Sequence, residues 1–262
     1  MLDLVIVWSI GLALNEVDLE EIIHVLTILL TDYVLLLSCS EKGGTTMEPK
    51  EKLRNETLES IQHTCSVFLK AYQNSGGTKV FDFSEMHKIA TGLYLAIWTR
   101  WEEYCRQLLV LELIENEGSI ILQRVKKFRT KKSASILANS VIEHIDHPDN
   151  FNTWSSFEVL LKRARKMVGD NNAFRNSGID KSKLKYIYKI RNFIAHSSDK
   201  AKSDFMKLLS LPPFSLSLQQ KQGITAGRLL CNQGTLNPLN PQETVFISIA
   251  NIIKGNIKLL VP

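Results

Sequence analysis

The stretch that most constrains the fold of this chain runs from residue 87 to about residue 116. Large apolar side chains recur in it at intervals of three and four residues, at Tyr94, Ile97, Trp98, Trp101, Cys105, Leu108 and Leu109. This spacing predicts one long amphipathic helix with a wide apolar face, and Glu102 falls beside that face. Other elements of the chain have to cover a face of this width.

Apolar periodicity of the same kind predicts further helices at 57–72, 120–128, 133–145, 154–168, 181–196, 200–209 and 242–260. The sequence does not decide the secondary structure of two stretches. Residues 79–83 form either a short strand or an extended entry to the long helix, and residues 214–241, broken by Gly and Pro, allow short strands or hairpins. We expect an all-α bundle in residues 47–210. A separate segment, 1–46, precedes it, and a less regular extension, 211–262, ends in a helix that packs on the bundle.

Charge divides the chain unevenly. Residues 1–46 hold seven acids and one base, a net charge of −6, and because the whole chain carries +5, residues 47–262 carry +11. A body this basic favours a polyanionic partner, with nucleic acid as the first candidate. The alternative is an ordinary set of solvated lysines on helix surfaces.

This body contains three basic runs, at 124–132, 162–166 and 181–189, and aromatic residues interrupt two of them. Alternating cations and rings suit a phosphate backbone whose bases stack on the protein. The sequence therefore marks five residues as RNA-binding candidates: Lys126, Lys127, Arg129, Lys185 and Lys189.

Residues 1–46 contain two apolar runs, 2–14 and 22–37. A signal peptide begins with positive charge, whereas Asp3 comes first here. A membrane span needs about 20 apolar residues, and Asp32 interrupts the second run near its middle. We expect two helices that pack on the body or on a partner, with a membrane anchor as the less favoured alternative. Two further hypotheses are that translation begins at Met47 and that this acidic segment covers the basic surface and inhibits it.

The sequence predicts no metal and no cofactor. The four cysteines are scattered without metal-ligand spacing, and Cys65 and Cys105 fall in apolar helical runs, as buried free thiols of a cytoplasmic protein do. His144 and His147 flank Asp146 with no further ligand nearby, so a surface pair at a helix end is favoured over a metal site. Neither Gly-Gly pair is followed by the Lys-Ser/Thr of a phosphate-binding loop.

The stretch 186–196 concentrates the chemistry of the chain. Its expected apolar stripe consists of Leu184, Ile187, Tyr188 and Ala195, and Arg191 occupies a position of that stripe. A guanidinium among apolar side chains is costly unless an anion, a partner or water meets it. Asn192 and His196, four residues apart, share a helix face. Arg191 and His196 lie about 140° apart around an ideal helix. They share a target only through the reach of the arginine, a helix end or a second subunit.

The segment Arg-Asn-Phe-Ile-Ala-His, residues 191–196, resembles the signature of HEPN domains, in which an Arg precedes a His by a few residues. The stretch 101–109, with its acidic and aromatic residues, looks like the early helix of these domains, and 154–160 looks like the helix before the signature helix. The arrangement is most similar to the RiboL-PSP branch and covers about residues 85–210.

The resemblance implies a helical domain that forms a homodimer and acts as a metal-independent endoribonuclease, as in phage-defence or toxin–antitoxin systems. Arg191 would hold the scissile phosphate, and His196 would be the acid or base. Asn192 and Glu102 would support them. The expected substrate is single-stranded RNA or an RNA loop such as that of a tRNA, cleaved to a 2′,3′-cyclic phosphate. The alternative is a non-catalytic module that binds RNA or a regulatory protein such as an antitoxin.

Overall fold

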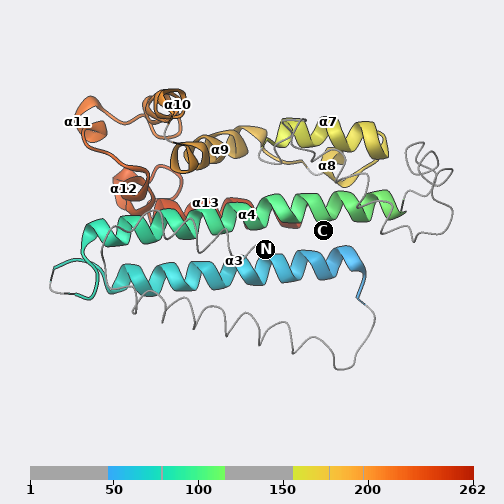
Figure 1. Ribbon diagram of the computed structural model, residues 1–262, viewed down its shortest axis with the longest axis horizontal. Coiled ribbons are helices and arrows are strands. Elements are labelled where there is room, and N and C mark those ends of the chain that lie inside the picture. The colour runs from blue at the N-terminus through green and yellow to red at the C-terminus, as the bar shows by residue number, and fades with distance from the viewer. Residues whose placement is uncertain (1–46, 78, 116–155, 177, 197) are drawn as a thin grey trace. The chain divides into compact units, whose positions relative to one another are not determined.

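The long helix α4, Phe83–Glu115, is the element on which the others pack (Figure 1). The computed structural model describes residues 47–115 and 156–262, except 78, 177 and 197. Trp98 and Trp101 of α4 are both buried, as its periodicity predicts. Asp82 and Glu85 fix its start, because each backbone N–H donates to the carboxylate of the other residue.

Two helices from opposite ends of the unit Pro49–Pro262 pack together on α4. Helix α3, Pro49–Gln73, runs antiparallel beside it, and α13, Val245–Leu260, contacts both (Figure 1). The rings of Phe68 and Phe246 stack with their centroids 4.0 Å apart and join α3 to α13. Helix α3 starts earlier than its apolar pattern predicts, since a proline fits the first turn of a helix.

A second group of four helices packs on α4 through its first and third members. It comprises α7, Phe157–Val168; α8, Ala173–Asn176; α9, Lys181–Ala195; and α10, Asp199–Ser210. The hydroxyl of Tyr94 on α4 donates a 2.7 Å hydrogen bond to the carbonyl of Ile187, which fixes the depth of α9. The rings of Phe193 and Phe205 stack at 4.1 Å and hold α10 on α9.

The possibility of short strands in 214–241 is wrong for the residues that the structure describes there. They form α11, Leu218–Lys221; α12, Ala226–Cys231; and a 3-10 turn, Gly234–Leu236. The side-chain oxygens of Ser217 and Thr225 cap the two short helices by accepting hydrogen bonds from backbone N–H groups. An apolar pattern does not reveal such caps. Helix α12 packs on α4 so closely that a Cβ at Gly227 would lie 2.3 Å from the carbonyl oxygen of His87.

The all-α prediction is confirmed, since the described residues contain no strand and only one isolated bridge, between Ser75 and Phe81. The expected helices at 57–72, 87–116, 154–168, 181–196, 200–209 and 242–260 correspond to α3, α4, α7, α9, α10 and α13. The helices expected within 1–46, at 120–128 and at 133–145 lie outside the described residues, as do the histidines at 144 and 147. None of the helices in the described ranges combines the length and hydropathy that crossing a bilayer requires.

Candidate functional site

Helix α9 carries the candidate site at its C-terminal end. The carboxylate of Asp180 caps its start by accepting from the N–H groups of Ser182, at 2.9 Å, and Lys183, at 3.3 Å. This capping lowers the pKa of Asp180, first through the Ser182 hydroxyl and then through the two backbone N–H groups. The helix ends at Ala195, and His196 is its C-cap residue in an extended conformation, with φ −131° and ψ 124°.

Arg191 lies at the border of the buried face of α9, not within it. The buried residues are Leu184, Tyr186, Ile187 and Ile190. The expected stripe through Tyr188, Arg191 and Ala195 is therefore displaced, because α4 and α10 bury the neighbouring face and leave Ala195 exposed. The side chain of Arg191 is 23% exposed, so its charge is partly desolvated but still reaches solvent.

The guanidinium of Arg191 contacts the imidazole of His196 within one chain. Nη1 of Arg191 lies 3.3 Å from Nε2 of His196 and also donates to Oδ1 of Asn192 at 3.3 Å. The contact is possible because His196 lies beyond the last helical residue, where an extended backbone turns its ring back toward Arg191. Asn192 and His196 consequently do not share a helix face as expected. They are linked by the His196 N–H, which donates to the Asn192 carbonyl at 2.9 Å.

The contact with Arg191 fixes the tautomer of the neutral imidazole. A guanidinium only donates hydrogen bonds, so Nε2 of His196 has to accept in this contact. The neutral ring then carries its proton on Nδ1. The Nε2 lone pair is thus engaged by the Arg191 N–H in this contact, and it takes a proton from an incoming hydroxyl group only after the guanidinium has turned to another acceptor, such as a phosphate oxygen.

Glu102 lies on the other side of Arg191. Its Oε1 is 4.0 Å from Nη2 of Arg191 and accepts a 2.7 Å hydrogen bond from the indole N–H of Trp98. The carboxylate is only 19% exposed, so water screens this ion pair less than a surface pair. The carboxylate of Glu102 thus fixes the position of the Arg191 guanidinium, and the indole of Trp98 fixes the position of that carboxylate.

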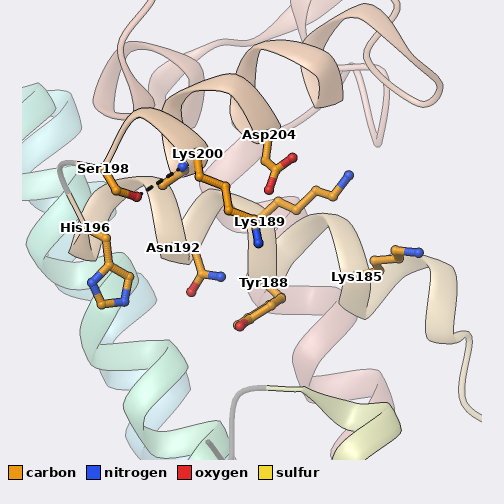
Figure 2. A pocket seen from close by; sticks show the side chains of 9 residues that line it. Lys185, Tyr188, Lys189, Asn192, His196, Ser198, Lys200 and Asp204 are labelled. Carbon is orange, nitrogen blue, oxygen red and sulfur yellow. Dashed lines mark hydrogen bonds between the residues drawn. The ribbon is translucent and has the colours of Figure 1, made fainter.

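A pocket of about 280 Å³ opens beside this pair, between α9 and the start of α10 (Figure 2). We call it the α9–α10 pocket. Three lysines, one acid and several neutral groups line it: Lys185, Tyr188, Lys189, Asn192, His196, Ser198, Lys200, Ala201 and Asp204. The ring of Tyr188 packs against Trp98 with centroids 6.3 Å apart, which keeps the phenol at the wall of the pocket. The pocket thus combines excess positive charge with an aromatic surface.

The structure brings most of the sequence-predicted candidates together. Arg191, His196, Asn192 and Glu102 form one connected cluster, and Lys185 and Lys189 line the adjoining pocket. Lys126, Lys127 and Arg129 lie outside the described residues.

Ser198, Lys200 and Asp204 were missed by the sequence reasoning. Their closeness to His196 along the chain was the signal that would have indicated them, since α10 begins at Asp199, three residues after His196.

The described ranges contain no group of three or more His, Cys, Asp or Glu residues that could hold a metal ion. Cys65 and Cys105 are free and buried, as expected, and burial raises the pKa of both thiols. Burial also raises the pKa of Cys231 to about 12, so its thiol is protonated and weakly nucleophilic at neutral pH.

Comparisons of this chain with protein-family models, with curated proteins and with solved structures found no match. The chemistry of the cluster therefore has to be argued from its own residues. A permanent cation, an imidazole, a carboxylate and a basic aromatic pocket together suit a phosphodiester substrate.

Proposed function

We propose that this protein is a metal-independent endoribonuclease whose catalytic residues are Arg191 and His196. The observation that carries the proposal is the 3.3 Å contact between Nη1 of Arg191 and Nε2 of His196 at the mouth of a lysine-lined pocket. The resemblance of residues 191–196 to the HEPN signature supports the same assignment. The expected substrate is single-stranded RNA or an RNA loop, such as the anticodon loop of a tRNA, in the cytoplasm.

His196 acts first in the proposed reaction. Its Nε2 takes the proton of a ribose 2′-OH, and the 2′-oxygen attacks the neighbouring phosphorus atom. The bond from phosphorus to the 5′-oxygen breaks, leaving a 2′,3′-cyclic phosphate and a free 5′-hydroxyl. The ribose itself supplies the nucleophile, so no bound water has to be activated.

Arg191 stabilises the charge that develops on the phosphate oxygens. Its planar guanidinium donates in a fork that matches two oxygens of one phosphate group. Glu102 and Asn192 restrain this fork, so less conformational entropy is lost when the phosphate arrives. Removal of the guanidinium would lower the rate about 100-fold or more, as the loss of one preorganised donor does elsewhere.

The leaving 5′-oxygen has to receive a proton. In a homodimer in which two copies of α9 line one cleft, His196 of the partner subunit would supply it in the protonated state. One imidazole would then act as base and the other as acid. This arrangement is part of the proposal and predicts that two differently inactivated copies remain inactive when they are mixed.

The direct test is incubation of the purified full chain with total tRNA in EDTA. Wild type should produce discrete fragments, and Arg191→Ala and His196→Ala should not. Arg191→Lys keeps the charge but not the fork, so it should retain little activity. His63→Ala, at an exposed histidine of α3, is the matched control and should cleave like wild type. Fragment ends should accept a ligated adaptor only after mild acid opens the cyclic phosphate and phosphatase removes it.

The same experiment distinguishes the alternative, a module that binds RNA without cutting it. The basic pocket with the Tyr188 ring favours such binding independently of catalysis. RNA retained by the wild type and by His196→Ala with equal affinity, without fragments from either, would replace the nuclease assignment with the binding one. Cleavage undiminished in His196→Ala would remove this residue from the mechanism.

A further inference from the structure

The α9–α10 pocket contains one carboxylate that a simple phosphate-binding surface does not need. Asp204 lies among Lys185, Lys189 and Lys200, where its negative charge opposes the approach of a polyanion. In the described part of the chain, its carboxylate forms neither an ion pair nor a hydrogen bond. Both of its oxygens are therefore free to accept hydrogen bonds from a ligand.

The position of Asp204 on α10 directs it to the pocket. It follows Ala201 by one helical turn, and the methyl group of Ala201 is buried and leaves space above the floor of the pocket. Figure 2 shows the side chain of Asp204 coming from α10, those of Tyr188 and Asn192 coming from α9, and that of His196 coming from just beyond the end of α9. One pocket thus holds a hydrogen-bond-accepting group and an aromatic ring next to the proposed catalytic histidine.

We propose that the α9–α10 pocket binds a guanine base, with Asp204 as the residue that selects it. This inference rests on the proposed nuclease function and names the nucleotide next to the cleaved phosphodiester. The Watson–Crick edge of guanine carries two adjacent donors, the N1–H and the 2-amino group, which match the two oxygens of one carboxylate. Tyr188 supplies the stacking surface, and the lysines hold the flanking phosphates.

The other bases fit this arrangement poorly. Adenine and cytosine each place an unprotonated ring nitrogen beside their amino group, and that nitrogen would face a carboxylate oxygen without a proton between them. Uracil offers a single N–H flanked by two carbonyl oxygens. A well-made pair of hydrogen bonds to a base discriminates by about 5-fold to 150-fold, so guanine should be favoured at least about fivefold.

The test measures binding separately from cleavage. Fluorescein-labelled 2′-O-methyl oligonucleotides lack the nucleophilic hydroxyl, so the wild-type full chain can bind them without cutting. Each has one central guanosine, inosine, adenosine or cytidine between uridines, and inosine lacks only the 2-amino group. Fluorescence anisotropy at low salt should give an affinity for the guanosine probe about tenfold above the adenosine probe.

Two variants test whether Asp204 is the residue that causes the preference for guanosine. Asp204→Asn should abolish the preference for guanosine over inosine and adenosine. Asp199→Asn removes the same charge from α10 at an exposed position that does not line the pocket, and it should keep the preference. Equal affinity of the wild type for all probes, or an unchanged preference in Asp204→Asn, would overturn the inference. Because tRNA cleavage is assayed separately, either result would leave the nuclease proposal standing. Absent cleavage alongside guanosine selection would overturn the nuclease proposal and the placement of the guanine beside a cleaved phosphodiester, but not the selection of guanine by Asp204.

Discussion

The indole N–H of Trp98 donates a 2.7 Å hydrogen bond to Oε1 of Glu102, one turn further along α4. The same oxygen lies 4.0 Å from Nη2 of Arg191, so a core residue determines where the carboxylate meets the guanidinium. The buried face of the longest described helix is connected in this way to the proposed reaction centre.

Removal of the Glu102 carboxylate should impair the position of Arg191. We expect Glu102→Ala to lower kcat for RNA cleavage about tenfold while KM changes less, because a displaced guanidinium stabilises the transition state poorly. Glu102→Gln keeps an acceptor for Trp98 but loses the charge. Its kcat should therefore lie between those of wild type and Glu102→Ala. The neighbouring Glu103, which accepts from Gln107 at 2.7 Å, provides the control Glu103→Ala. A wild-type kcat in Glu102→Ala would show that Arg191 needs no such support.

Affinity for RNA should depend on salt through the pocket lysines. Each phosphate contact releases counterions, with a slope of about −0.7 per contact for single strands in a plot of log affinity against log salt. We expect Lys185→Ala and Lys189→Ala each to weaken binding and to reduce the slope by about this amount. Lys70→Ala, at an exposed lysine on α3, should leave the slope unchanged. Equal slopes in all these proteins would exclude the pocket as the path of the RNA backbone.

Two glycines provide a matched test of helix packing. Gly227→Ala would place a Cβ 2.3 Å from the carbonyl oxygen of His87, so α12 would have to move away from α4. We expect the free energy of unfolding to fall by about 2 kcal/mol, as overpacking does elsewhere. Gly255 is exposed on α13, and a Cβ added there would meet open space. There the change to Ala should instead stabilise the protein by about 0.5–1 kcal/mol. Urea unfolding measures the free energy of unfolding of both variants and checks that it falls in the first and rises in the second.

His87 should make the stability of the protein sensitive to mild acid. Burial lowers the pKa of His87 below its ordinary value of 6.5, with a further lowering by Arg228 and a partial opposition by Asp82. Below about pH 6.5 the unfolded chain therefore binds more protons than the folded one, and the free energy of unfolding decreases as the pH falls. Well above this pH His87 is deprotonated in both the folded and the unfolded chain and contributes no slope.

Urea unfolding between about pH 7 and pH 5 checks this effect by comparing wild type with His87→Gln. The variant should lose less stability over this interval than wild type. His63→Gln, at an exposed histidine of α3, should behave like wild type. Parallel curves for wild type and His87→Gln would contradict the lowered pKa.

The Asp180 cap should stabilise α9 without taking part in catalysis. Asp180→Ala removes the acceptor of two backbone N–H groups and should cost about 1 kcal/mol of unfolding free energy. The pKa of Asp180 is lowered, so this contribution is present at neutral pH and disappears as acid protonates the carboxylate. Asp180→Asn should retain most of the stability. Since Arg191 lies at the other end of α9, the cleavage rate of the folded variants should not change.

The periodicity of the sequence was sufficient to predict the long helices and the buried face of α4. It failed for α12, whose six residues are held by a Thr225 cap and by the fit of Gly227 against His87. Neither feature is visible as a repeating apolar pattern. The same limit explains the displaced stripe of α9, because the neighbours of a helix decide which of two adjacent faces is buried.

The sequence by itself determined which four side chains are candidates for the site: Arg191, Asn192, His196 and Glu102. Only the tertiary structure decided that they meet. Helix periodicity is a local property of the chain, and on a continuous helix Arg191 and His196 would point in different directions. The helix ends at Ala195, so the extended backbone of His196 returns its imidazole to the guanidinium. Glu102 and Asp204 join the site from other helices, because the packing of α4 and α10 against α9 brings together residues that are distant or unrelated in the sequence pattern.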